Sequence, residues 1–179
     1  MDESIPAEEI IGAIKECIDA GYVRNIGLTQ LTPENIERAA KVHPIHTLEF
    51  AYSAANRAIE QNGVLDTARK LGIPVLAFGV LQHGMLSREN GAFTNLKKLA
   101  IEKGTTVEKL VQAYVTCKHP DMSVLIGTTS KEHLQDSIDA LRIEFTPEEI
   151  VMIESDFAST SIQGSGMRNI IFRDGRMER

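Results

Sequence analysis

The chain alternates short, continuous apolar runs with amphipathic segments, and this alternation constrains its fold more than any other feature. The runs Val23 to Leu28, Ile45 to Phe50, Ile73 to Phe78 and Met122 to Ile126 predict four buried strands. Continuously apolar strands separated by amphipathic helices indicate a parallel sheet that is covered by helices on its faces. A closed barrel of eight parallel strands needs about 250 residues and at least about 200, whereas this chain has 179. We therefore expect an α/β fold with about four parallel strands, either as a small open sheet or as half of a barrel.

Start and stop signals place helices around these strands. A threonine followed by proline, as in Thr32-Pro33 and Thr146-Pro147, is typical of a helix cap and first turn, and glycines such as Gly72 follow the expected helix ends. The expected helices begin near Pro6 and then run from about 32 to 42, 62 to 71, 94 to 103, 106 to 117, 130 to 141 and 146 to 157. Residues 1–158 are predicted to form one unit, and the Gly/Ser/Arg composition of residues 159–179 predicts a loosely ordered tail.

Charge and apolar length exclude several classes of function. A net charge of −6 and a pI near 5.4 argue against nucleic-acid binding, which relies on clustered Lys and Arg. The longest apolar stretch, Ile73 to Leu81, is too short to span a bilayer, so no membrane partner is expected. The acidic start Met1-Asp2-Glu3-Ser4 lacks the features of a secretory signal, and we expect a cytoplasmic protein.

Cysteines and histidines give no metal or disulfide pattern. Cys17 and Cys117 each lie among apolar neighbours on an expected helix, which predicts buried free thiols. His43 and His46 are separated by Pro44 and have no third ligand nearby in the sequence, so no metal site is predicted.

Five motifs then occur in a fixed order along the chain. They are Gly21 to Thr29, His43-Pro44-Ile45, Tyr52-Ser53, Gly72 to Phe78 and Ile126 to Leu134. Together they closely resemble the carboxyl-terminal half of the aldo-keto reductases, over the chain from its opening helix to about Phe157. The resemblance implies a partial (β/α)8 TIM barrel, with residues 1–158 as the cofactor-binding half and NADP(H) as the cofactor. It also implies carbonyl reduction by hydride transfer, with a tyrosine donating the proton.

The catalytic residues of that family are not matched here. Its Asp, Tyr, Lys and His lie on the first four strands of the barrel, and the resemblance covers only the last four. We therefore assign no catalytic residue and expect the isolated chain to be inactive or nearly so. Tyr52 is near a strand end, but the sequence places no lysine or aspartate to tune it.

The resemblance assigns four residues to the nicotinamide end of the cofactor. Thr29 and Gln30 match the family's Ser-Asn pair, which holds the carboxamide, and Glu49 matches a glutamine that also binds it. Phe78 matches the aromatic ring that stacks on the nicotinamide. Thr29 and Gln30 could instead satisfy a strand-to-helix loop, Glu49 could form a salt bridge or mark a loss of function, and Phe78 could belong to the core.

The other assigned residues lie toward the phosphates and the adenosine. Residues 127–130 precede a helix, so their position predicts an anion site from helix geometry alone. Leu81 and His83 match the loop along the pyrophosphate, although His83 could be an ordinary loop histidine. The family's charged partners of the 2′-phosphate are replaced by Gly127 and His133, and its Glu-Asn pair near the adenine by Asp136 and Ser137. We therefore expect weak or vestigial NADP(H) binding with little preference over NADH. The assigned set on this helix and its preceding loop is Gly127, Thr128, Thr129, Ser130, His133, Asp136 and Ser137. Ser130 could also be an ordinary helix cap.

The sequence is compatible with three hypotheses about the chain. The chain is a fragment or subunit of an aldo-keto reductase, a non-catalytic half-barrel interaction subunit, or a truncated reading frame whose other half is encoded elsewhere. An open parallel sheet leaves unpaired strand edges. For a reductase fragment or an interaction subunit, we therefore expect a homo-oligomer or a complementing half-barrel partner.

Overall fold

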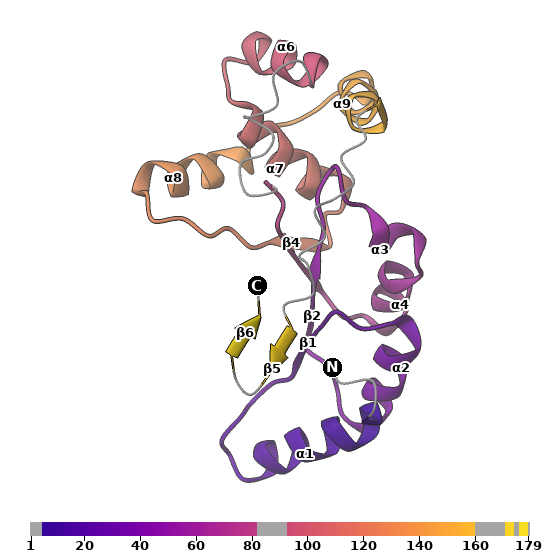
Figure 1. The fold of residues 1–179 in the computed structure, drawn as a ribbon. Coiled ribbons are helices and arrows are strands. Elements are labelled where there is room, and N and C mark those ends of the chain that lie inside the picture. Colours follow the sequence, from indigo (N-terminus) through magenta and orange to yellow (C-terminus); the bar gives the residue numbers. More distant parts are fainter. Residues whose placement is uncertain (1–4, 82–92, 160–170, 174–175, 179) are drawn as a thin grey trace.

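The computed structural model describes residues 5–81, 93–159, 171–173 and 176–178. Its main sheet has four parallel strands, as the alternation of the sequence predicts, and their order in the sheet is β1-β2-β3-β4. A parallel sheet in sequence order requires each connection to cross over the same face, and Figure 1 shows helices α1 to α4 along one side of β1 and β2. The strands are β1 (Gly27–Thr29), β2 (Thr47–Ala51), β3 (Val75–Phe78) and β4 (Met122–Val124).

The helices connect and flank these strands in the order that the sequence predicts. They are α1 (Ala7–Asp19), α2 (Pro33–Val42), α3 (Ala58–Gln61), α4 (Val64–Leu71), α6 (Thr94–Glu102), α7 (Val107–Lys118), α8 (Lys131–Ala140) and α9 (Pro147–Ser159). Two short strands, β5 (Ile171–Arg173) and β6 (Arg176–Glu178), pair antiparallel with each other.

Side-chain caps fix the starts of four helices. Thr32, Thr106 and Ser130 each accept a hydrogen bond from the backbone N–H three residues later, at 3.2 to 3.3 Å. Thr146 and Glu149 form a reciprocal capping box at the start of α9, with bonds of 2.8 and 3.3 Å. These four caps confirm the helix starts that the sequence predicts.

The strands are shorter and begin later than the apolar runs suggest. The prediction of a strand from Val23 is wrong, because β1 begins at Gly27 and pairs with β2 only from Thr47 onward. Similarly, Ile45 and Ile73 are buried ahead of β2 and β3 rather than within them, and β4 ends at Val124 instead of Ile126. An apolar residue can reach the core from a loop, whereas a strand exists only where a neighbour completes its hydrogen bonds.

The helix expected from Asn62 begins later in the structure, and a short helix that the sequence did not predict precedes it. Gly63 has a left-handed backbone with φ of 84°, so α4 begins at Val64, and a separate short helix, α3, precedes it. Glycine adopts this conformation without the steric penalty of other residues, and here it allows the chain to turn between the two helices.

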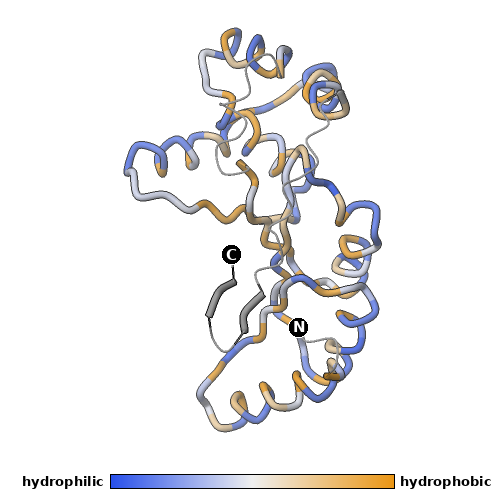
Figure 2. Tube along the Cα trace, viewed as in Figure 1, coloured by the Kyte–Doolittle hydropathy of each residue, from blue (hydrophilic) through white to orange (hydrophobic). Residues whose placement is uncertain are grey.

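Alternate residues of the strands point to two different faces of the sheet. Leu48 and Phe50 of β2 and Val75 and Ala77 of β3 are buried in the core with residues of the surrounding helices. The opposite face carries Thr29, Glu49, Leu76 and Ser123 in register, and these residues are half-buried or exposed. The helices therefore cover one face of the sheet, and the face that would point into a barrel is polar at several positions. Figure 2 shows hydrophobic residues along the strands and on parts of each helix.

The prediction that both cysteines are buried is wrong. Cys17 and Cys117 are free thiols, as predicted, but both are exposed. The buried side of α1 is centred on Ile11, and Cys17 is about 120° around the helix from it. Cys117 lies in the last turn of α7, beyond the buried stretch from Leu110 to Val115.

Candidate functional site

The carboxyl ends of the parallel strands meet at one edge of the sheet, and a cavity opens there between α7 and α8. Its volume is about 410 Å³. Leu81 enters it from the loop after β3, Gly127 and Thr128 from the loop after β4, and His133 from α8. The full lining is Leu81, Thr106, Glu108, Lys109, Gln112, Ile126, Gly127, Thr128, His133, Asp136 and Ser137. Six residues that the sequence assigned to the phosphates and adenosine are thus brought together, namely Leu81, Gly127, Thr128, His133, Asp136 and Ser137.

The start of α8 supplies hydrogen-bond donors at this cavity. Ser130 caps the helix by accepting from the N–H of His133 at 3.3 Å, and Thr128 Oγ1 accepts from the N–H of Ser130 at 3.1 Å. The N–H groups of the first helical turn have no acceptor within the helix itself, and the helix dipole places partial positive charge at this end. This arrangement is chemically suited to an anion such as a phosphate. Ser130 is therefore a helix cap, which was the alternative role that the sequence offered for it.

Charged side chains from both helices also meet at the cavity. Lys109 Nζ lies 2.6 Å from Asp136 Oδ1 and 3.9 Å from Asp139 Oδ2. Its hydrogen bond with Asp136 raises the pKa of Lys109 above the ordinary value, so the amine stays protonated near neutral pH. The site therefore contains a permanent cation that sequence comparison at the β4–α8 loop did not find. The spacing of Thr106, Lys109 and Gln112 every three residues was the available signal, because it places them on one face of α7.

Three residues assigned to the nicotinamide end lie on the sheet face opposite to the one that the described helices cover. Thr29 and Glu49 are partners in the β1–β2 register, and Thr29 Oγ1 donates to the backbone oxygen of Glu49 at 2.8 Å. Phe78 is half-buried at the end of β3, two residues beyond Leu76 and therefore on the same face as Glu49.

Other assigned residues lie apart from these groups. Gln30 has a left-handed backbone with φ of 56° and lines a second cavity of about 410 Å³, together with residues such as Asn56 and Asn62. Thr129 is exposed, and both Thr129 and Ser130 lie outside the lining of the α7–α8 cavity. His83 lies outside the described residues.

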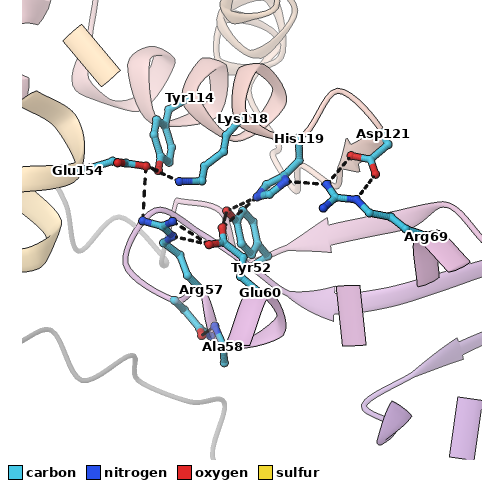
Figure 3. Close-up of polar contacts among 11 residues, drawn as sticks. Tyr52, Arg57, Ala58, Glu60, Arg69, Tyr114, Lys118, His119, Asp121 and Glu154 are labelled. Carbon is cyan, nitrogen blue, oxygen red and sulfur yellow. Dashed lines mark hydrogen bonds and ion pairs between the residues drawn. The ribbon is translucent and has the colours of Figure 1, made fainter. Parts of the chain in front are cut away.

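A second polar centre, which the sequence did not reveal, surrounds Tyr52 (Figure 3). We call it the Tyr52 cluster, and it consists of Tyr52, Arg57, Glu60, Tyr114, Lys118, His119 and Glu154. The Tyr52 hydroxyl donates to Glu60 and lies 2.8 Å from Nε2 of His119, which is itself 2.9 Å from Glu60. Arg57 donates to Glu60 at 2.7 and 3.0 Å.

The same cluster extends to the helices α7 and α9. Glu154 of α9 accepts from Tyr114 at 2.9 Å, pairs with Lys118, and lies 3.6 Å from Arg57. The segment after β2 is thereby linked to two helices that follow much later in the chain. This linkage points to a structural role.

The environment of the cluster keeps Tyr52 neutral and Glu60 ionised. Burial raises the pKa of Tyr52 far above its ordinary value, and the hydrogen bond to Glu60 raises it further. Burial also raises the pKa of Glu60, but hydrogen bonds from Arg57, Tyr52 and His119 outweigh it and lower the pKa to about 2. A tyrosine held neutral beside a permanent carboxylate is a poor proton donor near neutral pH, so the geometry argues against Tyr52 as a general acid.

No helix among the described residues is both long and apolar enough to cross a membrane. In the same part of the chain, no group of three or more His, Cys, Asp and Glu side chains is arranged to hold a metal ion.

Comparison with known proteins agrees with the arrangement of the strands and the cavity. The sequence profile of the aldo/keto reductase family matches residues 1–156. The chain therefore belongs to the aldo/keto reductase family.

Relatives of known sequence or structure support the same assignment. The chain is 38% identical over 87 residues to a probable pyridoxal reductase 2 of Schizosaccharomyces pombe, a match that covers 49% of this chain and 26% of the relative. It is 26% identical to an aldo/keto reductase from Klebsiella pneumoniae in complex with NADP and acetate, with a TM-score of 0.76 over 88% of this chain and 56% of that one. A glycerol dehydrogenase from Gluconobacter oxydans, 21% identical with a TM-score of 0.78 over the same shares, has the same fold.

The chain thus spans just over half the length of the solved relatives that it matches. Four parallel strands with flanking helices match that share of the barrel, so the fold is a partial (β/α)8 barrel. The alternative of an unrelated small open sheet is excluded by this match.

Proposed function

We propose that this chain provides the nucleotide-binding part of an aldo-keto reductase, an NADP(H)-dependent oxidoreductase that interconverts carbonyls and alcohols. The observation that carries the proposal is the cavity between α7 and α8, where six residues assigned from the sequence meet at the start of a capped helix. The relative from Klebsiella pneumoniae, whose structure contains NADP, supports the choice of ligand.

The donor set of the cavity fits the adenosine end of this nucleotide. The first-turn N–H groups of α8, with Thr128, would hold a phosphate, while Ser130 would order this turn as its cap, and Asp136 and Ser137 would face the ribose or adenine. Lys109 and His133 provide positive charge when protonated. We expect weak binding, because Asp136 and Glu108 place negative charge in the same cavity.

At the other end of the nucleotide, the uncovered face of the sheet would hold the nicotinamide. Thr29, Gln30 and Glu49 would offer hydrogen bonds to the carboxamide, and Phe78 would stack against the ring. Gln30 lines a separate cavity, so it would have to turn from that position to contribute. When bound, the nucleotide supplies or accepts the hydride.

We infer that the chain alone reduces carbonyls at or near background. The residues that the resemblance assigns to the catalytic tetrad have no counterpart in these 179 residues. General acid catalysis is worth roughly 10² to 10⁴-fold in rate. Tyr52 does not replace the missing acid, because its hydroxyl is buried against Glu60 and its pKa is raised.

A second candidate function is that of a half-barrel interaction subunit, and the surface of α8 favours it. Leu134, Ile138 and Leu141 recur along α8 and its carboxyl cap and are 50%, 47% and 65% exposed, and Figure 2 shows hydrophobic residues among hydrophilic ones along this helix. Strand β4, which precedes α8 in the chain, is at an edge of the four-stranded sheet. An exposed apolar stripe and an open strand edge are both suited to contact with a second copy of the chain or a complementing half-barrel. The free thiols of Cys17 and Cys117 support a reducing, cytoplasmic setting.

Nucleotide titration, turnover and light scattering together test these proposals. We expect the purified, folded chain to bind NADPH weakly, to reduce a simple aldehyde at background rate, and to scatter as a particle larger than the 19.7 kDa monomer. If folded protein fails to bind millimolar nucleotide, the nucleotide-binding proposal is wrong and the interaction subunit takes its place. Robust turnover free of host reductases would contradict the expected lack of activity. A monodisperse 19.7 kDa particle would contradict the oligomer.

A further inference from the structure

The α7–α8 cavity contains a cation and an acid that face each other across two helices. Lys109, in the first turn of α7, and Asp136, in the middle of α8, are both cavity-lining residues, and their charged atoms are 2.6 Å apart. The side chains are 19% and 37% exposed, so both remain accessible from the cavity. This ion pair is therefore part of the surface that the proposed nucleotide would contact.

The neighbouring acid Asp139 has other partners. It accepts from Gln135 at 3.0 Å and lies 3.8 Å from Arg142, whereas Lys109 is 3.9 Å away. Lys109 is therefore committed mainly to Asp136.

These two charges have opposite effects on the two nicotinamide nucleotides. NADPH and NADH differ only by the 2′-phosphate on the adenosine ribose. A carboxylate favours a free 2′-hydroxyl, from which it accepts a hydrogen bond, whereas a cation favours the 2′-phosphate. A paired lysine and carboxylate offer neither charge in full.

We infer that the Lys109–Asp136 ion pair sets the nucleotide preference of this chain by cancelling two opposed selectivities. This inference rests on the proposed binding of the nucleotide at the α7–α8 cavity. It replaces the sequence-based explanation of weak discrimination, in which permanent charges are simply missing, with one in which a cation is present but neutralised. Removing one partner or the other should then change the preference in opposite directions.

The test uses fragments that contain only the adenosine end. Adenosine 2′,5′-bisphosphate and adenosine 5′-monophosphate are titrated by calorimetry into the wild-type chain, Lys109→Gln, Asp136→Asn and the double variant. We expect Lys109→Gln to weaken the bisphosphate relative to the monophosphate by about three- to tenfold, because Asp136 then repels the 2′-phosphate. Asp136→Asn should strengthen it by a similar factor, and the double variant should return the ratio to within about twofold of wild type.

A matched control separates this effect from a general loss of charge. Lys70→Gln removes a lysine from another interhelical pair, Lys70–Glu37 at 2.9 Å, whose residues do not line the cavity. It should leave the ratio unchanged. Circular dichroism and thermal unfolding confirm that each variant is folded.

The outcomes distinguish the inference from the function on which it rests. If the wild-type chain binds NADPH and both fragments but the two single variants shift the ratio in the same direction, or not at all, the inference is overturned and the pair merely joins α7 to α8. If folded wild-type chain binds neither NADPH nor the fragments, the proposed function fails and the inference fails with it.

Discussion

The α7–α8 cavity and the Tyr52 cluster both contain ion-paired side chains, but they differ in the burial of their central residues and in the space left around them. In the Tyr52 cluster, Tyr52 is 1% and His119 6% exposed, and Glu60 has three hydrogen-bonding partners. In the cavity, Asp136 and Lys109 remain partly open and the first turn of α8 directs N–H groups outward. The comparison teaches that a concentration of charged residues does not by itself mark a binding site. In the Tyr52 cluster, the buried Tyr52 and His119 and their bonded neighbours join β2 to later helices, whereas the α7–α8 cavity leaves room for a ligand beside its charged side chains.

The largest expected effect comes from breaking the Tyr52 cluster. Glu60→Gln removes the carboxylate that Arg57, Tyr52 and His119 share, and we expect it to lower the free energy of unfolding by about 3 kcal/mol. NADPH affinity per folded molecule should not change. Urea unfolding and calorimetry measure the two quantities, with Glu37→Gln as a control because its carboxylate is exposed. A Glu60→Gln protein that matched the wild type in stability would contradict the structural role.

The same carboxylate should make stability depend on pH. The pKa of Glu60 falls from 4.5 to about 2 on folding, so its contribution is fully present above pH 4.5 and is lost as the pH falls toward about 2. This shift corresponds to about 3 kcal/mol. Urea unfolding of the wild type and Glu60→Gln at several pH values isolates it, since other groups titrate in both proteins. The account fails here if the difference between the two proteins does not shrink as the pH is lowered.

Removing only the Tyr52 hydroxyl should have a smaller effect. In Tyr52→Phe, Glu60 keeps its bonds to Arg57 and His119, and the ring stays buried. We expect the free energy of unfolding to fall by about 1 to 2 kcal/mol, with no change in nucleotide binding or in the background rate of carbonyl reduction. Loss of a measurable reductase activity in this variant would instead show that Tyr52 is a catalytic acid.

The smallest expected change in stability comes from the helix cap at the cavity. Ser130→Ala should cost about 1 kcal/mol, because the N–H of His133 loses its acceptor. It should also weaken NADPH binding, since the start of α8 becomes less ordered. Thr146→Ala removes a comparable cap at α9, outside the cavity lining, and should affect stability alone. Equal nucleotide affinity in the two variants would argue against a role for the α8 start.

The sequence predicted the features that depend on residues close together in the chain, namely the strands and the helix starts. Apolar runs predicted four parallel strands, and threonine or serine caps predicted the starts of α2, α7, α8 and α9. Strand ends were misplaced because they depend on pairing: Val23 has no partner at its level of the sheet, although it is apolar. Cys17 was misplaced because small apolar residues occur on either side of an amphipathic helix.

Contacts between residues far apart in the chain could not be predicted from the sequence. The assigned residues of the β4–α8 loop and of α8 could be found together because they are close in the sequence, and the structure places Gly127, Thr128, His133, Asp136 and Ser137 around one cavity. Lys109 comes from the preceding helix, and its pairing with Asp136 depends on how α7 and α8 pack. Tyr52 and His119 are 67 positions apart in the sequence and meet only in the folded chain.

The central claim is that the α7–α8 cavity, and not the Tyr52 cluster, binds the nucleotide. Titrating NADP⁺ into isotope-labelled chain while recording amide nuclear magnetic resonance signals tests both regions in one measurement. We predict that the signals of Gly127, Thr128 and His133 shift with nucleotide concentration, while those of Glu60 and His119 stay in place. Shifts confined to the Tyr52 cluster, or no shifts in folded protein at millimolar nucleotide, would contradict the account.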